Sequence, residues 1–195
     1  MTDPLAPQDD GNTDRTPEEL EGLIPSYITT RAELNEAEQA NILEASEWAF
    51  SRKRDVVDDD FLKKLHGRMY GNVWEWAGAY RDSGKNIGIE AHQITTELRK
   101  LLDDVRYWTE HETYSADEIA ARYHHRLTHI HCYPNGNGRH ARMATDLLLT
   151  SLGAKPFSWG NANLVDAGKT RSRYIAALRA ADKHDLGRLL EFVRT

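Results

Sequence analysis

The stretch HIHCYPNGNGRHAR, which ends at Arg142, combines residue types that can bind and activate a phosphate ester. Glycine tolerates positive φ angles, so Gly136 and Gly138 allow successive backbone N–H groups to converge on an anion. A helical pattern follows directly, and the free N–H groups at the start of a helix favour phosphate. Arg139 and Arg142 are three residues apart, so both guanidinium groups lie near one face of that helix. The pattern predicts a phosphate-binding turn with two arginine ligands and an imidazole, His131, at its rim.

Two other interpretations of this stretch remain open. Turns rich in glycine and asparagine between helices are often purely structural. His125 and His129 have the i, i+4 spacing that can hold zinc, with His131 close behind, which would suit a zinc-dependent hydrolase. The residues between His125 and His129 include no acidic side chain that could act as a general base. The sequence therefore favours the phosphate site over the zinc site.

Length and composition favour a single soluble domain. The chain has 195 residues, 39% of them hydrophobic and 29% charged, which is enough to bury a sizeable core. The formal net charge of −6 argues against direct binding of nucleic acid. A single cysteine, Cys132, excludes an internal disulfide, and neither a secretory signal nor a membrane-spanning apolar stretch occurs. We therefore expect a cytoplasmic protein without membrane contact.

Apolar periodicity predicts an all-α fold with one small hairpin. Residues 1–22 are polar and acidic and are expected to form a flexible arm. The chain then becomes helical, with Thr29 or Thr30 as the N-cap and Glu33 in the first turn. The turn signal DSGKN beside IGI predicts the hairpin. Helical patterns cover residues 28–53, 58–71, 94–108, 115–131, 139–153, 170–181 and 185–193.

The stretch from His131 to Arg142 resembles the signature of the Fic/Doc family, His-x-Phe-x-Asp/Glu-Gly-Asn-Gly-Arg-x-x-Arg. VWEWAGAYR resembles the family's segment before a flap hairpin, and YIAALRAADKHDLGRLLEFV resembles its C-terminal end. The resemblance implies a Fic-type helical bundle with a small β-hairpin flap over residues 54–195, preceded by an N-terminal helix within residues 23–53. TTRAELNEAEQANILEA together with PNGNGRHAR resembles the subgroup called mobile mystery protein B, which is encoded beside a helix-turn-helix partner in a toxin–antitoxin-like pair.

The resemblance implies a nucleotidyltransferase that moves AMP from ATP to a Ser, Thr or Tyr hydroxyl of a target protein. His131 would be the general base that deprotonates this hydroxyl. Mg²⁺ would bridge the α- and β-phosphates, with Asn135 as its protein ligand. The target backbone would be held by strand addition along a flap made of Lys85, Asn86, Ile87, Gly88 and Ile89. The nucleotide would be bound by Asn135, Gly136, Asn137, Gly138, Arg139 and Arg142.

The motif departs from the family pattern at two positions. Tyr133 replaces phenylalanine, which costs little provided that its hydroxyl finds a partner. Asn135 replaces the acidic residue that binds Mg²⁺, so metal affinity should fall because the amide carries no charge. Two alternatives stay open: a Doc-like protein kinase, and a catalytically weak nucleotide-binding module bound to the helix-turn-helix protein. A homodimer is also left open.

A regulatory glutamate is a further expectation from the resemblance. Many family members carry an inhibitory helix of pattern Ser/Thr-x-x-x-Glu-Gly/Asn, whose glutamate pairs with the second arginine of the motif. Thr29 and Glu33 fit this spacing, although Leu34 stands where glycine or asparagine is expected. The resemblance therefore implies a Glu33–Arg142 ion pair and autoinhibition. The alternative is that Glu33 is only a first-turn acid favoured by the helix dipole.

Overall fold

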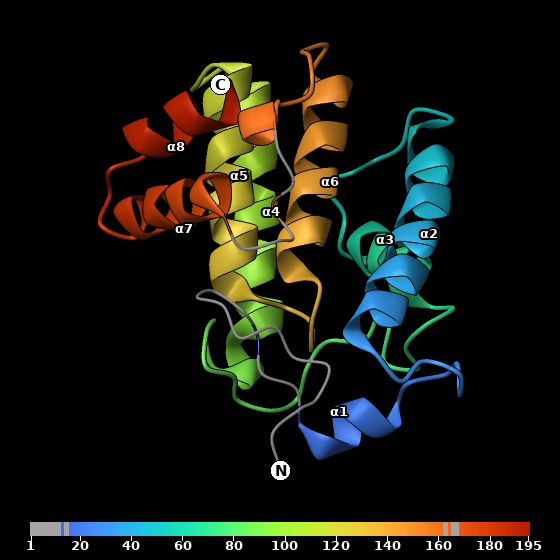
Figure 1. Ribbon diagram of the computed structural model, residues 1–195. Coiled ribbons are helices and arrows are strands. Elements are labelled where there is room, and N and C mark those ends of the chain that lie inside the picture. Colours follow the sequence, from blue (N-terminus) through green and yellow to red (C-terminus); the bar gives the residue numbers. More distant parts are fainter. Residues whose placement is uncertain (1–12, 14–15, 162–163, 165–167) are drawn as a thin grey trace.

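The computed structural model describes Thr13, residues 16–161, Leu164 and residues 168–195. No described helix is long and apolar enough to cross a membrane. The helices, shown in Figure 1, are α1 (Pro17–Glu21), α2 (Arg31–Phe50), α3 (Asp59–Tyr70), α4 (Ile94–Glu110), α5 (Ala116–Ile130), α6 (Asn137–Ser151), α7 (Lys169–Ala181) and α8 (Gly187–Val193). Short 3₁₀ turns occur at Ala91–Gln93 and Trp159–Asn161. The described chain is therefore mainly helical, as predicted.

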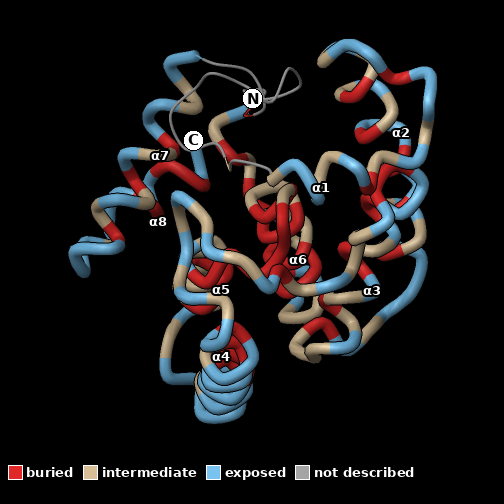
Figure 2. The backbone as a smooth tube through the Cα atoms, turned by 90° about the horizontal axis from the view of Figure 1, so that it is seen from below, coloured by how far each residue is buried: buried red, intermediate tan, exposed pale blue. Residues whose placement is uncertain are grey.

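α5 and α6 form the centre of the bundle, with α2 and α3 in contact with α6, and α4 and α8 in contact with α5 (Figure 1). α4 lies along α5, α2 packs on α3, and α7 pairs with α8. One apolar cluster joins helices α2 to α6, and a second joins α7 and α8 to α5 and α6. Figure 2 shows buried residues along α5 and α6, whereas α4 turns one side to solvent. The turn between α5 and α6 therefore begins and ends on firmly packed helices.

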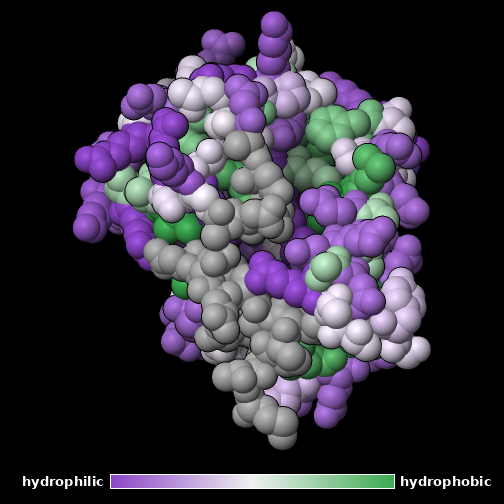
Figure 3. All heavy atoms as spheres, viewed as in Figure 1, coloured by the Kyte–Doolittle hydropathy of each residue, from purple (hydrophilic) through white to green (hydrophobic). Residues whose placement is uncertain are grey.

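Outside this core, the face of the molecule in Figure 3 is mainly hydrophilic, with hydrophobic side chains in small separate patches. The only β pairing in the described part of the chain is an isolated bridge between Leu23 and Trp74.

Side-chain caps begin three of the helices whose patterns the sequence predicts. Thr30 caps α2, and Glu33 completes a capping box by accepting from the Thr30 backbone N–H. Asp58 caps α3, and Ser115 caps α5 by accepting from the backbone N–H of Glu118. These bonds satisfy N–H groups that have no partner inside the helix, so local sequence decides where these helices start.

The segment expected to be a β-hairpin has no paired strands. Residues 82–90 form an irregular loop with bends. The guanidinium of Arg81 instead donates hydrogen bonds to carbonyl groups near both ends of this loop. Its Nη1 donates to the Ser83 carbonyl over 2.8 Å, and its Nη2 donates to the Ile89 carbonyl. A single buried cation therefore holds the loop in place of cross-strand hydrogen bonds, which corrects the prediction of a hairpin.

The N-terminal arm differs from expectation where the structure describes it. Residues 1–12, 14 and 15, which belong to the expected flexible arm, lie outside the described residues. In residues 16–22 the chain forms α1, which begins with a capping box between Thr16 and Glu19. The indole Nε1 of Trp76 donates to the Glu19 carbonyl over 3.0 Å and fixes α1 on the domain. This partner is distant in sequence, so the polar composition of the arm did not reveal it.

Candidate active site

The turn between α5 and α6 depends on two left-handed residues. His131, the C-cap of α5, has a φ of 57°, and Gly136, the N-cap of α6, has a φ of 79°. A Cβ on Gly136 would lie 2.5 Å from the Tyr70 ring, so only glycine fits there. Asn137 closes the turn, because its Oδ1 accepts from the Tyr133 N–H over 2.9 Å and its Nδ2 donates to the Tyr133 carbonyl over 2.7 Å.

His131 and the start of α6 line one cavity of about 520 Å³. Arg139 and Arg142 line the same cavity, and residues of α2 and α7 form further walls. α6 has no side-chain cap, so the N–H groups of its first turn, at residues 137–139, have no partner within the helix. Backbone donors at a helix N-terminus and two guanidinium groups therefore face one space, which suits a polyphosphate.

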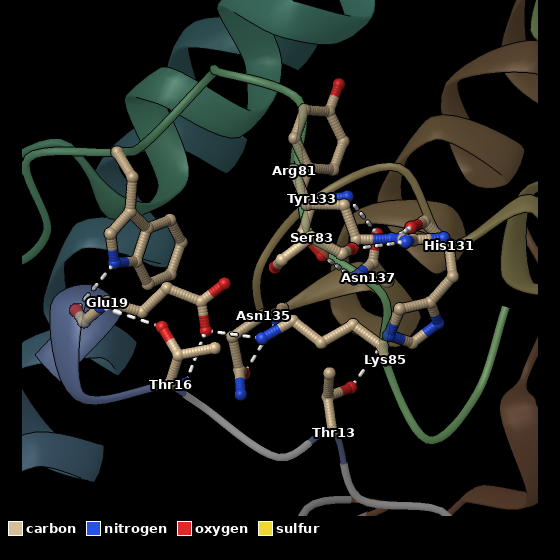
Figure 4. Close-up of polar contacts among 12 residues, drawn as sticks. Thr13, Thr16, Glu19, Arg81, Ser83, Lys85, His131, Tyr133, Asn135 and Asn137 are labelled. Atoms are coloured by element: carbon tan, nitrogen blue, oxygen red, sulfur yellow. Dashed lines mark hydrogen bonds and ion pairs between the residues drawn. The ribbon is translucent and has the colours of Figure 1, made fainter. Parts of the chain in front are cut away.

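His131 is neutral and oriented as a base. Its pKa is lowered to about 4, mainly by burial, and the positive charges of Arg81 and Lys85 act in the same direction against the hydrogen bond with the Thr128 carbonyl. The imidazole is therefore uncharged at pH 7. Nδ1 lies 3.4 Å from the Thr128 carbonyl oxygen, which can only accept, so the ring proton belongs on Nδ1. Nε2 is then the acceptor, and it lies 2.7 Å from the Thr13 hydroxyl (Figure 4).

Arg81 organises the site and was missed by the sequence analysis. Only 3% of it is exposed, and its Nε donates to the His131 carbonyl over 2.6 Å. Its backbone N–H donates to the Cys132 carbonyl over 3.0 Å. Because the same guanidinium binds the loop at residues 82–90, one side chain joins that loop to the turn. The available signal was a lone cation directly after the aromatic-rich segment VWEWAGAY.

The predicted flap segment passes His131 at Gly88, although it forms no hairpin. A Cβ on Gly88, whose φ is 98°, would lie 2.5 Å from the His131 Cβ, so the loop backbone touches the imidazole side chain. Lys85 points instead toward α1 (Figure 4), and Ile89 packs on the main apolar cluster. The flap residues that line the cavity are Asn86, Ile87 and Gly88.

The two asparagines of the turn have different roles. Asn135 Oδ1 accepts from the Gly136 N–H over 2.7 Å, which leaves one lone pair for a hard cation such as Mg²⁺. The Asn135 carbonyl accepts from Nε2 of the buried His66 over 3.0 Å. The side chain of Asn137 is held in closing the turn through one donor and one acceptor, and its backbone N–H at the start of α6 is free of any partner within the helix.

A glutamate of α2 forms an ion pair with Arg139, the first of the two arginines predicted to bind phosphate. Glu38 is 3% exposed, and its Oε2 accepts from Arg139 Nη1 over 2.6 Å. Its other oxygen accepts from the Trp74 indole over 2.8 Å. The guanidinium of Arg142 lies 5.7 Å from the centre of the Tyr174 ring, at the cavity wall. Phosphate binding at Arg139 would therefore compete with a buried carboxylate.

The predicted Glu33–Arg142 ion pair is wrong for this structure. Glu33 Oε2 accepts from the backbone N–H groups of Thr29 and Thr30, each over 2.8 Å, and these bonds lower its pKa. Glu33 is thus the first-turn acid that the alternative described. The sequence signal for Glu38 was its place four residues after Leu34, in the buried stripe of α2, where a charge needs a partner.

The zinc interpretation is not supported by the described residues. His125 Nε2 and His129 Nδ1 face the same carboxylate, Asp182, at 2.8 and 3.4 Å. His131 is turned toward Thr13 instead. The described chain contains no group of three or more side chains that could hold a metal ion in this way.

A helical bundle with an anion-binding turn, a buried base and two arginines in one cavity defines a Fic domain, and comparisons agree. A model of the Fic/DOC family matches residues 56–149. The fold is similar to the N-terminal Fic domain of a VirB-translocated Bep effector from Bartonella quintana, with a TM-score of 0.71, 20% identity, and coverage of 90% of this chain and 92% of that chain. It is also similar to BepC from Bartonella tribocorum with bound AMPPNP, with a TM-score of 0.67, 20% identity, and coverage of 91% and 98%.

Residues 56–149 therefore form a domain of the Fic/DOC family. The chain is 30% identical over 148 residues to the protein adenylyltransferase fic-1 of Caenorhabditis elegans, which covers 74% of this chain and 27% of that protein. It is 28% identical over 146 residues to the protein adenylyltransferase Fic of Drosophila melanogaster, covering 73% and 28%. The chain thus spans only about a quarter of the length of these curated relatives.

Proposed function

We propose that this protein transfers AMP from ATP to a hydroxyl side chain of a protein. The observation that carries the proposal is the position of an unprotonated, buried His131 Nε2 beside a helix N-terminus and two arginines. Such a site can accept a proton from a hydroxyl while it stabilises negative charge on a phosphate. The similarity to protein adenylyltransferases supports the same reaction.

In the proposed reaction, His131 Nε2 takes the proton of the attacking hydroxyl. The N–H groups of residues 137–139 bind the oxygens of the α-phosphate, and Arg142 and Arg139 hold the β- and γ-phosphates. Asn135 would hold Mg²⁺, which would supply neutralisation of the phosphate charge. The loop at Lys85–Ile89 would place the target backbone so that its hydroxyl reaches His131.

We further propose that Glu38 restrains this activity, the role that the resemblance had implied for Glu33. Glu38 occupies Nη1 of Arg139 and compensates its charge, so a phosphate would have to compete with this carboxylate for the guanidinium. Since one oxygen of Glu38 is held by the Trp74 indole, the carboxylate is kept in place. Removal of its charge should release Arg139 without a loss of shape.

The test is incubation of cell lysate with the purified protein, Mg²⁺ and either α-labelled or γ-labelled ATP. We expect transfer of the α-label alone, loss of that transfer in His131→Ala, and an increase of at least about tenfold in Glu38→Gln, or ~1.4 kcal/mol. Glu33→Gln is the matched control, because it removes the same charge from the same helix and should not increase transfer. Transfer of the γ-label would instead support the Doc-like kinase.

A catalytically weak nucleotide-binding module is the second candidate, favoured by the uncharged Asn135 at the metal position. Nucleotide binding by calorimetry without transfer from any variant would support this candidate. The proposal also includes membership of the mobile mystery protein B subgroup, a helix-turn-helix partner, a toxin-like role, a homodimer and a cytoplasmic location.

A further inference from the structure

A hydroxyl of this chain already occupies the place of an acceptor. Thr13 Oγ1 lies 2.7 Å from His131 Nε2, the nitrogen that the tautomer leaves free to accept a proton. Thr13 also lines the cavity that contains Gly136, Arg139 and Arg142. The two residues are 118 positions apart in the chain, so the contact comes from tertiary structure.

α1 is anchored next to the loop at His131. Glu19, in α1, accepts from the Thr16 N–H over 2.9 Å and forms an ion pair with Lys85 of the flap loop. The Lys85 and Glu19 side chains are only 2% and 11% exposed, so this pair is largely shielded from water (Figure 4). α1 is thus attached to the loop that lies over His131, and Figure 4 shows Thr13 pointing from the N-terminal side toward the imidazole.

We propose that Thr13 is an internal acceptor and that the protein transfers AMP to its own Thr13. The inference rests on the proposed AMP transferase activity. Thr13 Oγ1 attacks the α-phosphorus of ATP and forms a new Oγ1–P bond. The bond from the α-phosphorus to the oxygen that bridges to the β-phosphate breaks. Pyrophosphate leaves with that electron pair, and the Thr13 proton moves to His131 Nε2.

An internal hydroxyl has a large advantage over an external one. Because Thr13 is already hydrogen-bonded to the base, no encounter in solution and little reorientation are needed. The unmodified Thr13 must also leave His131 before a hydroxyl of another protein can take its place. The same residue therefore serves as acceptor and as competitor of the target protein.

The test uses the full chain, as wild type and as Glu38→Gln, with α-labelled ATP and Mg²⁺, followed by peptide mass spectrometry. We expect one adenylyl group on Thr13, absent from Thr13→Val and from His131→Ala, and present in Thr13→Ser. Ser26→Ala is the matched control, since it removes an exposed hydroxyl from the same N-terminal region and should keep the label. Labelling of lysate proteins should rise at least about twofold in Thr13→Val, because the internal competitor is gone.

Transfer within one chain predicts a labelling rate per molecule that does not change with protein concentration. It also predicts that a His131→Ala chain, which keeps Thr13, stays unlabelled when mixed with an active Thr13→Val chain. His131-dependent label on lysate proteins but none on Thr13 would overturn this inference and leave the proposed function standing. Absence of His131-dependent transfer to any protein, in either background, would overturn both.

Discussion

At the scale of single residues, Tyr133 combines a well-packed ring with a hydroxyl group that is not matched by its surroundings. Its ring stacks on His66 with centres 3.7 Å apart and planes 16° apart. Its hydroxyl is buried and has no hydrogen-bond partner in the described structure, and burial raises its pKa well above the usual value. The partner that the sequence analysis required for a tolerable Phe-to-Tyr exchange is therefore missing.

Tyr133→Phe should make the protein more stable by about 1 kcal/mol, because it removes a buried O–H that has no partner and keeps the stacked ring. The measurement is the free energy of unfolding in urea. Tyr123→Phe is the control, since the Tyr123 hydroxyl donates to the Val56 carbonyl over 3.3 Å. That control should lose roughly 0.5–1.5 kcal/mol. A loss of stability in Tyr133→Phe would contradict the prediction.

At the scale of elements, the loop at residues 82–90 and the turn between α5 and α6 act as one unit. Arg81 donates hydrogen bonds to carbonyl groups of both segments, so neither can move without breaking bonds to a buried cation. The backbone at Gly88 lies so close to the His131 side chain that a methyl group on Gly88 would push the loop and the turn apart.

Gly88→Ala should reduce AMP transfer by at least about tenfold, because its Cβ would lie 2.5 Å from the His131 Cβ and 3.0 Å from Arg81 Nη2. The positive φ of Gly88 adds strain of roughly 1–3 kcal/mol. The measurements are α-label transfer and ATP affinity, and the affinity should change little because α6 is untouched. Gly84→Ala, in the same loop, meets nothing within 4 Å and should behave as wild type. Full transfer by Gly88→Ala would show that the loop position is not needed.

At the scale of the whole molecule, the core contains histidines that stay neutral. Burial lowers the pKa of His124 to about 3 and of His131 and His140 to about 4, and it lowers that of His66 well below 6.5. In the unfolded chain each group titrates near 6.5. Below that pH the unfolded state binds protons that the folded state excludes, so stability is full above about pH 6.5 and falls as the pH decreases toward 4.

Unfolding in urea at pH 7.5 and pH 5.5 should therefore show a marked loss of stability in acid, up to about 1.4 kcal/mol per pH unit for each buried histidine. His140→Gln should lower the number of protons taken up on unfolding by about one, which makes the pH dependence of stability less steep. The glutamine amide can still donate to the Leu62 carbonyl as His140 does. His92→Gln replaces an exposed histidine and is the control for the substitution itself. A stability that is flat between these pH values would contradict the prediction.

The sequence by itself determined the features that depend on neighbours along the chain. The caps at Thr30, Asp58 and Ser115 start helices because each side chain bonds a backbone N–H three residues ahead. The turn from His131 to Arg142 could be predicted for the same reason, since glycine, a helix start and two arginines one turn apart are local properties.

Only the tertiary structure decided which distant groups meet at that turn. Glu33 and Glu38 both lie on α2, and the buried face of the helix, not the spacing from a threonine, selects the one that pairs with Arg139. Arg81 and Thr13 reach His131 across 50 and 118 residues of sequence, distances over which spacing carries no information on contact. Tertiary packing determines these partners, because a buried charge or hydrogen-bond donor is stable only where the fold supplies an opposite charge or an acceptor.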